Sequence, residues 1–110
     1  DYKENQGMLF LYLKDQARSF WMPDTYFDLD IFYLDKDLNI LKVHRDVPHH
    51  PGKETPPEIP RVPPVYARHV LEMRADSKIA KELKPGDKLN WSSTPALWQI
   101  IRGIRLEQSH

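Results

Sequence analysis

The sequence predicts a mostly β (α+β) protein: a small antiparallel, barrel-like sheet with one short helix and a long Pro-rich loop. The chain has 110 residues and a mass of 13.0 kDa, which suits one core because cores divide only beyond roughly 200 residues. Its apolar residues fall in five or six short runs bounded by turn residues, and only one segment has helical spacing. We therefore expect residues 1–110 to form a single domain.

The first predicted strand is the run Met-Leu-Phe-Leu-Tyr-Leu at residues 8–13. Both parities of this run are apolar, which is typical of a strand covered on both faces. Residues 14–17 are polar, and large side chains return at residues 18–22 before Pro23. This pattern predicts a hairpin-like pair of strands.

A β-hairpin is predicted from residues 29–34 and 40–44, which flank the polar turn 35–39. The segment that follows, residues 45–64, holds seven of the ten prolines and has no apolar periodicity. Long segments of this kind are binding loops, lids or linkers, so we expect a loop there, either ordered as a cover or acting as a linker.

Residues 69–73 predict the next strand, with Leu71 and Met73 on the same face. Residues 88–91 predict another strand. The tail around 96–101 favours a strand over a helix, with a weaker continuation behind it.

The single helix is predicted between these strands. Asp76 is a suitable N-cap, and Ile79, Ala80 and Leu83 have the spacing of one apolar stripe. The Lys-Pro-Gly sequence at 84–86 ends the helix.

Composition restricts the function. Sixteen Lys and Arg residues balance sixteen Asp and Glu residues, so no net positive field attracts a phosphate backbone, and we expect no nucleic-acid partner. No apolar run approaches the roughly 18 residues of a membrane span. The absence of cysteine excludes disulfides and thiolate chemistry but fits both reducing and oxidising compartments.

Five sequence blocks, in order and approximate spacing, resemble a widespread prokaryotic family, the domain of unknown function 192. The similarity covers residues 7–89, and its blocks are Gly7-Met8-Leu9-Phe10, Phe20-Trp21-Met22-x-x-Thr25, Leu29-Asp30-Ile31-Phe32-x-Leu34-Asp35, Val70-Leu71-Glu72 and Lys84-x-Gly86-Asp87. The resemblance implies a compact β-rich fold, often exported or lipid-anchored, with no assigned reaction.

Three departures from the family pattern bear on this resemblance, and one of them is a Pro-rich loop that is longer than usual. Asp24 stands where the family commonly has Asn, and only six residues precede Gly7, where the family carries a further strand and a short helical segment. We therefore expect upstream sequence to be missing. A removed leader would agree with an extracytoplasmic (periplasmic or secreted) location, while a cytoplasmic one stays open.

Asp30 is the first candidate site residue. Side chains alternate along a strand, so Asp28 and Asp30 share a side with Phe32 and Leu34. A buried carboxylate must be paired, so we expect Asp30 to accept hydrogen bonds from backbone N–H groups, from Thr25 or from Arg18. The alternative is a pKa-shifted acid in a hydrolase or lyase site.

Trp21 is the second candidate, because Arg18, Asp24 and Thr25 lie close to it in sequence. An exposed Trp with polar neighbours can stack on a sugar ring. The alternative is a core Trp, and for Trp91 and Trp98 we expect the core position.

Metal and cofactor chemistry find little support. His44, His49 and His50 are neighbours in sequence, but side chains on an extended Pro-flanked segment diverge, so we expect no metal site and no cofactor. The leading hypothesis is a non-catalytic binding or accessory module for a glycan or other polar ligand. Its candidate ligand-binding residues are Arg18, Trp21, Asp24, Thr25 and Asp30. The alternatives are an enzyme with Asp30 as acid or base and a structural domain that binds a protein partner.

Overall fold

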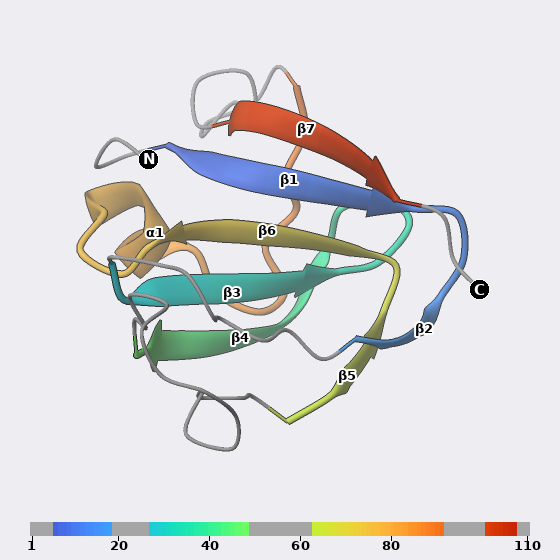
Figure 1. Ribbon diagram of the computed structural model, residues 1–110, viewed down its shortest axis with the longest axis horizontal. Coiled ribbons are helices and arrows are strands. Elements are labelled where there is room, and N and C mark those ends of the chain that lie inside the picture. Colours follow the sequence, from blue (N-terminus) through green and yellow to red (C-terminus); the bar gives the residue numbers. More distant parts are fainter. Residues whose placement is uncertain (1–5, 19–26, 49–62, 92–100, 108–110) are drawn as a thin grey trace, which may run out of the picture.

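A computed structural model describes residues 6–18, 27–48, 63–91 and, as backbone, 101–107. Its main feature is a five-stranded sheet with the strand order β4-β3-β6-β1-β7, and β2 and β5 form a separate two-stranded ribbon (Figure 1). The bounds are β1 Gly7–Tyr12, β2 Gln16–Arg18, β3 Leu29–Leu34, β4 Ile40–Val47, β5 Val65–Ala67, β6 His69–Arg74, α1 Lys78–Glu82 and β7 Ile101–Glu107. The mostly β class is confirmed. Within the described ranges, the sheet ends at β4 and β7, and no strand pairing closes it into a barrel.

The predicted hairpin is present as β3 and β4, which pair antiparallel. Its turn is held by Asp35, whose Oδ1 accepts the backbone N–H groups of Asp37 (2.8 Å) and Asn39 (2.9 Å). β4 runs on to Val47, so the expected loop at 45–64 begins as strand. Residues 49–62 of that loop lie outside the described part of the chain.

β1 is the predicted inner strand, lying between β6 (antiparallel) and β7 (parallel). The expected hairpin between residues 8–13 and 18–22 is not formed by the described residues, because β1 pairs with β6 and β7 while β2 pairs with β5, with Gln16 opposite Ala67. Residues 19–22 of the expected hairpin lie outside the described part of the chain. The physical reason is visible at Arg18, whose buried side chain donates to the Ala67 carbonyl and so ties β2 to β5.

Helix α1 has the predicted apolar stripe, with Ala80 and Leu83 buried. Its N-cap is Ser77 rather than Asp76, because Ser77 Oγ accepts the Ala80 N–H at 3.1 Å while the Asp76 carboxylate binds Arg74. The expected strand at 88–91 is reduced to isolated bridge positions at Lys88, which pairs with Asn39, and at Asn90.

Trp91 is about half exposed, at 48%, so its predicted core position is wrong. Trp98 lies outside the described residues.

In the part of the chain that the structure describes, no helix has the length and apolar character needed to cross a membrane.

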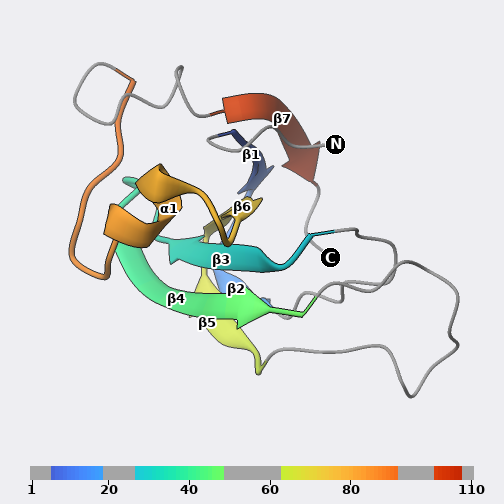
Figure 2. The ribbon, with the colours of Figure 1, turned by 90° about the vertical axis from the view of Figure 1, so that its left-hand side faces the viewer.

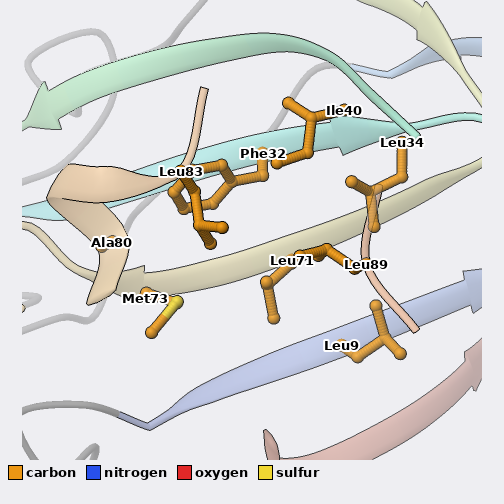
Figure 3. Packing of buried hydrophobic residues seen from close by; sticks show 9 residues of the cluster. All are labelled: Leu9, Phe32, Leu34, Ile40, Leu71, Met73, Ala80, Leu83 and Leu89. Carbon is orange, nitrogen blue, oxygen red and sulfur yellow. The ribbon is translucent and has the colours of Figure 1, made fainter. Parts of the chain in front are cut away.

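Each face of the sheet carries its own apolar cluster, as the alternation along β3 requires. α1 and the segment that follows it lie on one face (Figure 2). The cluster there, the helix-side cluster, is shown in Figure 3 and consists of Leu9, Phe32, Leu34, Ile40, Leu71, Met73, Ala80, Leu83 and Leu89. The other, the ribbon-side cluster, consists of Leu29, Ile31, Tyr33, Val47, Ala67 and Val70. Phe32 and Tyr33 therefore point to opposite faces, and both are fully buried.

Candidate functional site

Asp30, on β3, is a buried carboxylate with 1% of its surface exposed. Its Oδ1 accepts the backbone N–H of Asp46 at 2.9 Å, and its Oδ2 binds Arg45 Nη1 at 2.8 Å. A backbone donor was among the expected partners. The side-chain partner is Arg45 rather than Arg18, and Thr25, the other expected partner, lies outside the described residues.

A β-bulge brings both donors to Asp30. On β3, Leu29 pairs with Val47 and Ile31 pairs with His44, so two residues of β4 stand opposite Asp30. Asp46 is the residue that absorbs the irregularity, with a positive φ of 53°. Asp is among the few non-glycine residues that adopt this left-handed conformation readily, and bulges of this kind re-aim side chains at the edge of a sheet.

Arg45 extends the network from Asp30 to α1. Its guanidinium donates to the carbonyl oxygen of Ala80 at 2.6 Å and to that of Leu83. The last carbonyls of a helix have no partner within the helix, and a cation there also complements the helix dipole. The guanidinium carbon lies 5.5 Å from the centroid of the Phe32 ring. Asp30 and Arg45 thus fasten the C-terminal end of α1 to the sheet.

An open pocket of about 370 Å³ lies beside this network. It forms where β3 begins and β6 ends, next to α1, and its lining residues are Phe27, Asp28, Asp46, Arg74, Ala75, Asp76 and Lys81. Three carboxylates and two cations therefore surround a space that suits a ligand of about monosaccharide size.

Arg74 organises one wall of the pocket. Its Nε and Nη2 bind the two carboxylate oxygens of Asp76 at 2.9 and 2.7 Å, which is the bidentate geometry that makes Arg–carboxylate pairs strong. The guanidinium lies over the Phe27 ring, 4.2 Å from its centroid. The hydrogen bonds from Arg74 hold the pKa of Asp76 below its ordinary value, so this side chain is a carboxylate acceptor at neutral pH.

Arg18 lies on the opposite side of the sheet from Asp30. It is 4% exposed, and it donates to the carbonyl oxygens of Ala67 (3.4 Å) and Lys14 (2.5 Å). Its guanidinium sits 3.5 Å from the centroid of the Tyr12 ring, and Tyr12 and Ala67 both belong to the ribbon side. The structure therefore does not bring Arg18 and Asp30 into one site.

The other three candidate residues, Trp21, Asp24 and Thr25, lie outside the described residues. The pocket residues Phe27, Asp46, Arg74 and Lys81 were not among the candidates. The hairpin pattern could have indicated that a residue of β4 faces Asp30, but not which one.

If the pairing of Leu34 with Ile40 continued without interruption, His44 would stand opposite Asp30. The irregularity between Tyr33 and Leu34 shifts the pairing by one residue, so that Arg45 faces Asp30 instead.

Metal ligands do not gather in the described ranges, where no group of three or more His, Asp or Glu side chains could hold an ion. His44 is engaged otherwise: its Nε2 lies 3.1 Å from the Pro63 carbonyl oxygen and its ring packs edge-on against Tyr33. His49 and His50 lie outside the described part.

Comparison with protein families identifies the fold family. The model of DUF192, described as "Uncharacterized ACR", matches residues 1–91. The chain belongs to the DUF192 family. Strand β7 follows the matched region, so the family match includes the pocket and the Asp30–Arg45 network and excludes one edge of the sheet. No curated protein sequence matches this DUF192 chain.

Among solved structures, the chain is similar to a crystal structure from Sinorhizobium meliloti 1021 at 1.55 Å resolution, described as that of a "putative transcription regulator". The two share 26% sequence identity with a TM-score of 0.62. The match covers 80% of this chain and 64% of the other, so the DUF192 chain spans less than two thirds of that relative.

Proposed function

We propose that this DUF192 chain is a non-catalytic binding module for a small, hydroxyl-rich ligand such as a glycan fragment, and that the pocket next to α1 receives it. The observation that carries the proposal is the pocket itself, in which Asp46 and Lys81 join the Arg74–Asp76 pair around about 370 Å³. Carboxylates and a guanidinium supply acceptors and paired donors, which suit adjacent hydroxyl groups of a sugar.

The state of the carboxylates favours binding over catalysis. A general acid needs a raised pKa and access to its substrate, whereas Asp30 is buried and both of its oxygens accept hydrogen bonds. Asp76 has a lowered pKa because of its hydrogen bonds from Arg74. Asp30 is thus enclosed and fully hydrogen-bonded, and Asp76 acts as a fixed anion, which supports a binding role rather than the hydrolase or lyase alternative.

The sequence-based candidates remain part of the proposal. Thr25 precedes the pocket residue Phe27 by two positions, so Trp21, Asp24 and Thr25 lie shortly before the pocket in the sequence. We propose that Trp21 adds a stacking surface for the ligand there. Arg18, at the end of β2, donates to the Ala67 and Lys14 carbonyl oxygens, so we propose that it holds the β2–β5 ribbon rather than touching the ligand.

The test is an amide chemical-shift titration of the protein against cell-wall glycan fragments, simple sugars and divalent metals. Saturable shifts at Phe27, Asp46 and Arg74, lost in Asp46→Asn, are the expected result. Asn keeps the tolerance for positive φ at this position and removes the charge. Asp37→Asn, a change in an exposed turn carboxylate, is the matched control. An absence of shifts across the panel would reject the proposal.

A role in transcription is the second candidate, favoured by the name of the S. meliloti relative. Because the 16 basic residues of this chain are balanced by 16 acidic ones, we expect such a role to act through ligand or protein contacts rather than through DNA phosphates. Fluorescence anisotropy with duplex DNA at low and physiological salt tests this: tight binding that weakens steeply with salt would favour direct DNA contact.

We also propose that the module works outside the cytoplasm, on the basis of the family resemblance described above. Fractionation of cells that express the complete open reading frame tests the location. Recovery of the protein only with cytoplasmic markers would exclude it.

A further inference from the structure

Tyr33, on β3, carries an unusual hydroxyl group. The residue has none of its surface exposed, and its Oη has no hydrogen-bond partner among the residues that the structure describes. A buried hydroxyl that has left water without gaining a partner is costly, and proteins rarely leave one in that state. The atom therefore indicates a group that binds to it.

Glu72, on β6, is a charged group that the sheet geometry places on the same side as Tyr33. Tyr33 pairs with Val70, and Ile31 pairs with Glu72, so Tyr33 and Glu72 are diagonal neighbours, within reach of long side chains. Glu72 is also buried, with 6% exposed. A carboxylate can accept about four hydrogen bonds, so Glu72 can accept one more from a bound group in addition to its existing contacts.

The protonation state of Tyr33 determines whether a bound group must accept or donate a hydrogen bond at Oη. Burial, together with the negative charge of Glu72, raises the pKa of the Tyr33 hydroxyl above its ordinary value of 10.0. Tyr33 is therefore a hydrogen-bond donor at neutral pH, and Glu72 only accepts. His44 closes one side of Tyr33, with ring centroids 5.2 Å apart and an interplanar angle of 81°.

We propose that Tyr33 and Glu72 form an internal site for a single hydroxyl group, which accepts a hydrogen bond from Tyr33 Oη and donates one to the Glu72 carboxylate. A bound water molecule and a hydroxyl of a small polyol share this chemistry. The site shares no residue with the pocket beside α1, so it goes beyond the proposed function and stands or falls independently of it.

The first test is a high-resolution crystal structure of the unmodified protein. Electron density within hydrogen-bond distance of both Tyr33 Oη and the Glu72 carboxylate is expected. Density of a single oxygen identifies water, and density that continues beyond it identifies a polyol. An empty space at Tyr33 Oη would overturn the proposal.

The second test measures melting temperatures of Tyr33→Phe and Glu72→Gln. If a hydroxyl is bound, Tyr33→Phe removes its donor and lowers the melting temperature by several degrees, with a smaller loss for Glu72→Gln. If Oη has no occupant, Tyr33→Phe leaves the melting temperature unchanged or raises it, which overturns the proposal. Tyr66→Phe is the matched control, because Tyr66 is 68% exposed and loses the same atom.

A third measurement, with an added polyol, distinguishes a bound water molecule from a bound polyol hydroxyl. Sorbitol is added far below the concentrations at which polyols act as general osmolytes. A rise in melting temperature for the unmodified protein that is absent in Tyr33→Phe assigns the site to a polyol. Equal responses of the two proteins, together with the loss in Tyr33→Phe, assign it to water.

Discussion

Arg45 Nη1 binds Asp30 Oδ2 at 2.8 Å, and the same guanidinium holds the carbonyl oxygens at the end of α1. Asp30 is thus a bracket between two strands and a helix. It also holds Asp46, whose side chain lines the pocket, through the Asp46 backbone N–H. Removing one partner of a buried ion pair is strongly destabilising, because the other partner is then a buried charge without a counter-charge.

We expect Asp30→Ala to lower the free energy of unfolding by about 3 kcal/mol. This value is at the low end of the losses usual for breaking a buried ion pair, because the Arg45 side chain is 37% exposed and can be hydrated once Asp30 is removed. Urea denaturation monitored by circular dichroism measures the change. Asp37→Ala, at an exposed turn position, should stay within about 0.5 kcal/mol of the unmodified protein. A similar small effect at Asp30 would show that the bracket does not stabilise the fold.

Asp46 allows backbone strain to be separated from charge. Because its φ is 53°, Asp46→Gly should retain stability, whereas Asp46→Val should cost about 1–2 kcal/mol, since a β-branched residue tolerates the left-handed region poorly. Both substitutions remove the pocket carboxylate equally. Equal stabilities of the Gly and Val variants, measured in urea, would rule out a strained bulge at this position.

His69 predicts a dependence of stability on pH. Burial, with the neighbouring charges of Arg68 and Arg18, lowers the pKa of its ring below 6.5, and its Nδ1 accepts the Tyr12 N–H at 3.1 Å. The unfolded chain therefore binds a proton at a higher pH than the folded chain does. Stability is complete above 6.5 and falls as the pH drops from there to the folded pKa.

The measurement is a series of urea unfolding curves across this pH window, compared with His69→Gln. The variant should have a flatter pH profile in that window, since Gln does not titrate. Identical slopes for the two proteins would assign the pH dependence to other groups.

The glycines at 7 and 86 should respond differently to alanine. A Cβ on Gly7 would overlap the Glu72 carbonyl oxygen and lie 2.7 Å from Met73 Cγ, so Gly7→Ala must push β6 away from β1 and should cost about 2–3 kcal/mol. Gly86 has open space but a φ of 95°, and its alanine variant should lose about 1–2 kcal/mol from backbone strain alone. Thermal and urea denaturation of the two variants test this order, and a Gly7→Ala variant as stable as the unmodified protein would contradict the close approach of β1 and β6.

The sequence allowed the local features of the fold to be predicted. The β3–β4 hairpin follows from two short apolar runs around a turn rich in Asp and Asn, and the stripe at Ala80 and Leu83 follows from helical spacing. Strand pairings between segments far apart in the sequence could not be predicted in this way. The β2–β5 ribbon depends on the contact of Arg18 with the Ala67 carbonyl, 49 residues away, which no local pattern reports.

The candidate site shows the same division. The need of Asp30 for hydrogen-bond donors was predictable, because a carboxylate on an apolar face must be paired. The identity of its partner was not, since register irregularities in β4 decide which residues face it. The pocket joins the start of β3, the end of β4, the end of β6 and α1, so its residues meet only once these four elements have come together.

The pairing of β1 with β7 has a consequence for how the chain folds. Gly7 pairs with Ile101 and Met8 with Gly103, so the sheet cannot complete this pairing until strand β7 at Ile101–Glu107 is present. Contacts between such distant residues slow folding because the entropy of closing the intervening loop must be offset first. The β3–β4 hairpin, with its short turn, is the natural starting point. During synthesis on the ribosome, β1 would stay without its parallel neighbour until Ile101–Glu107 has emerged.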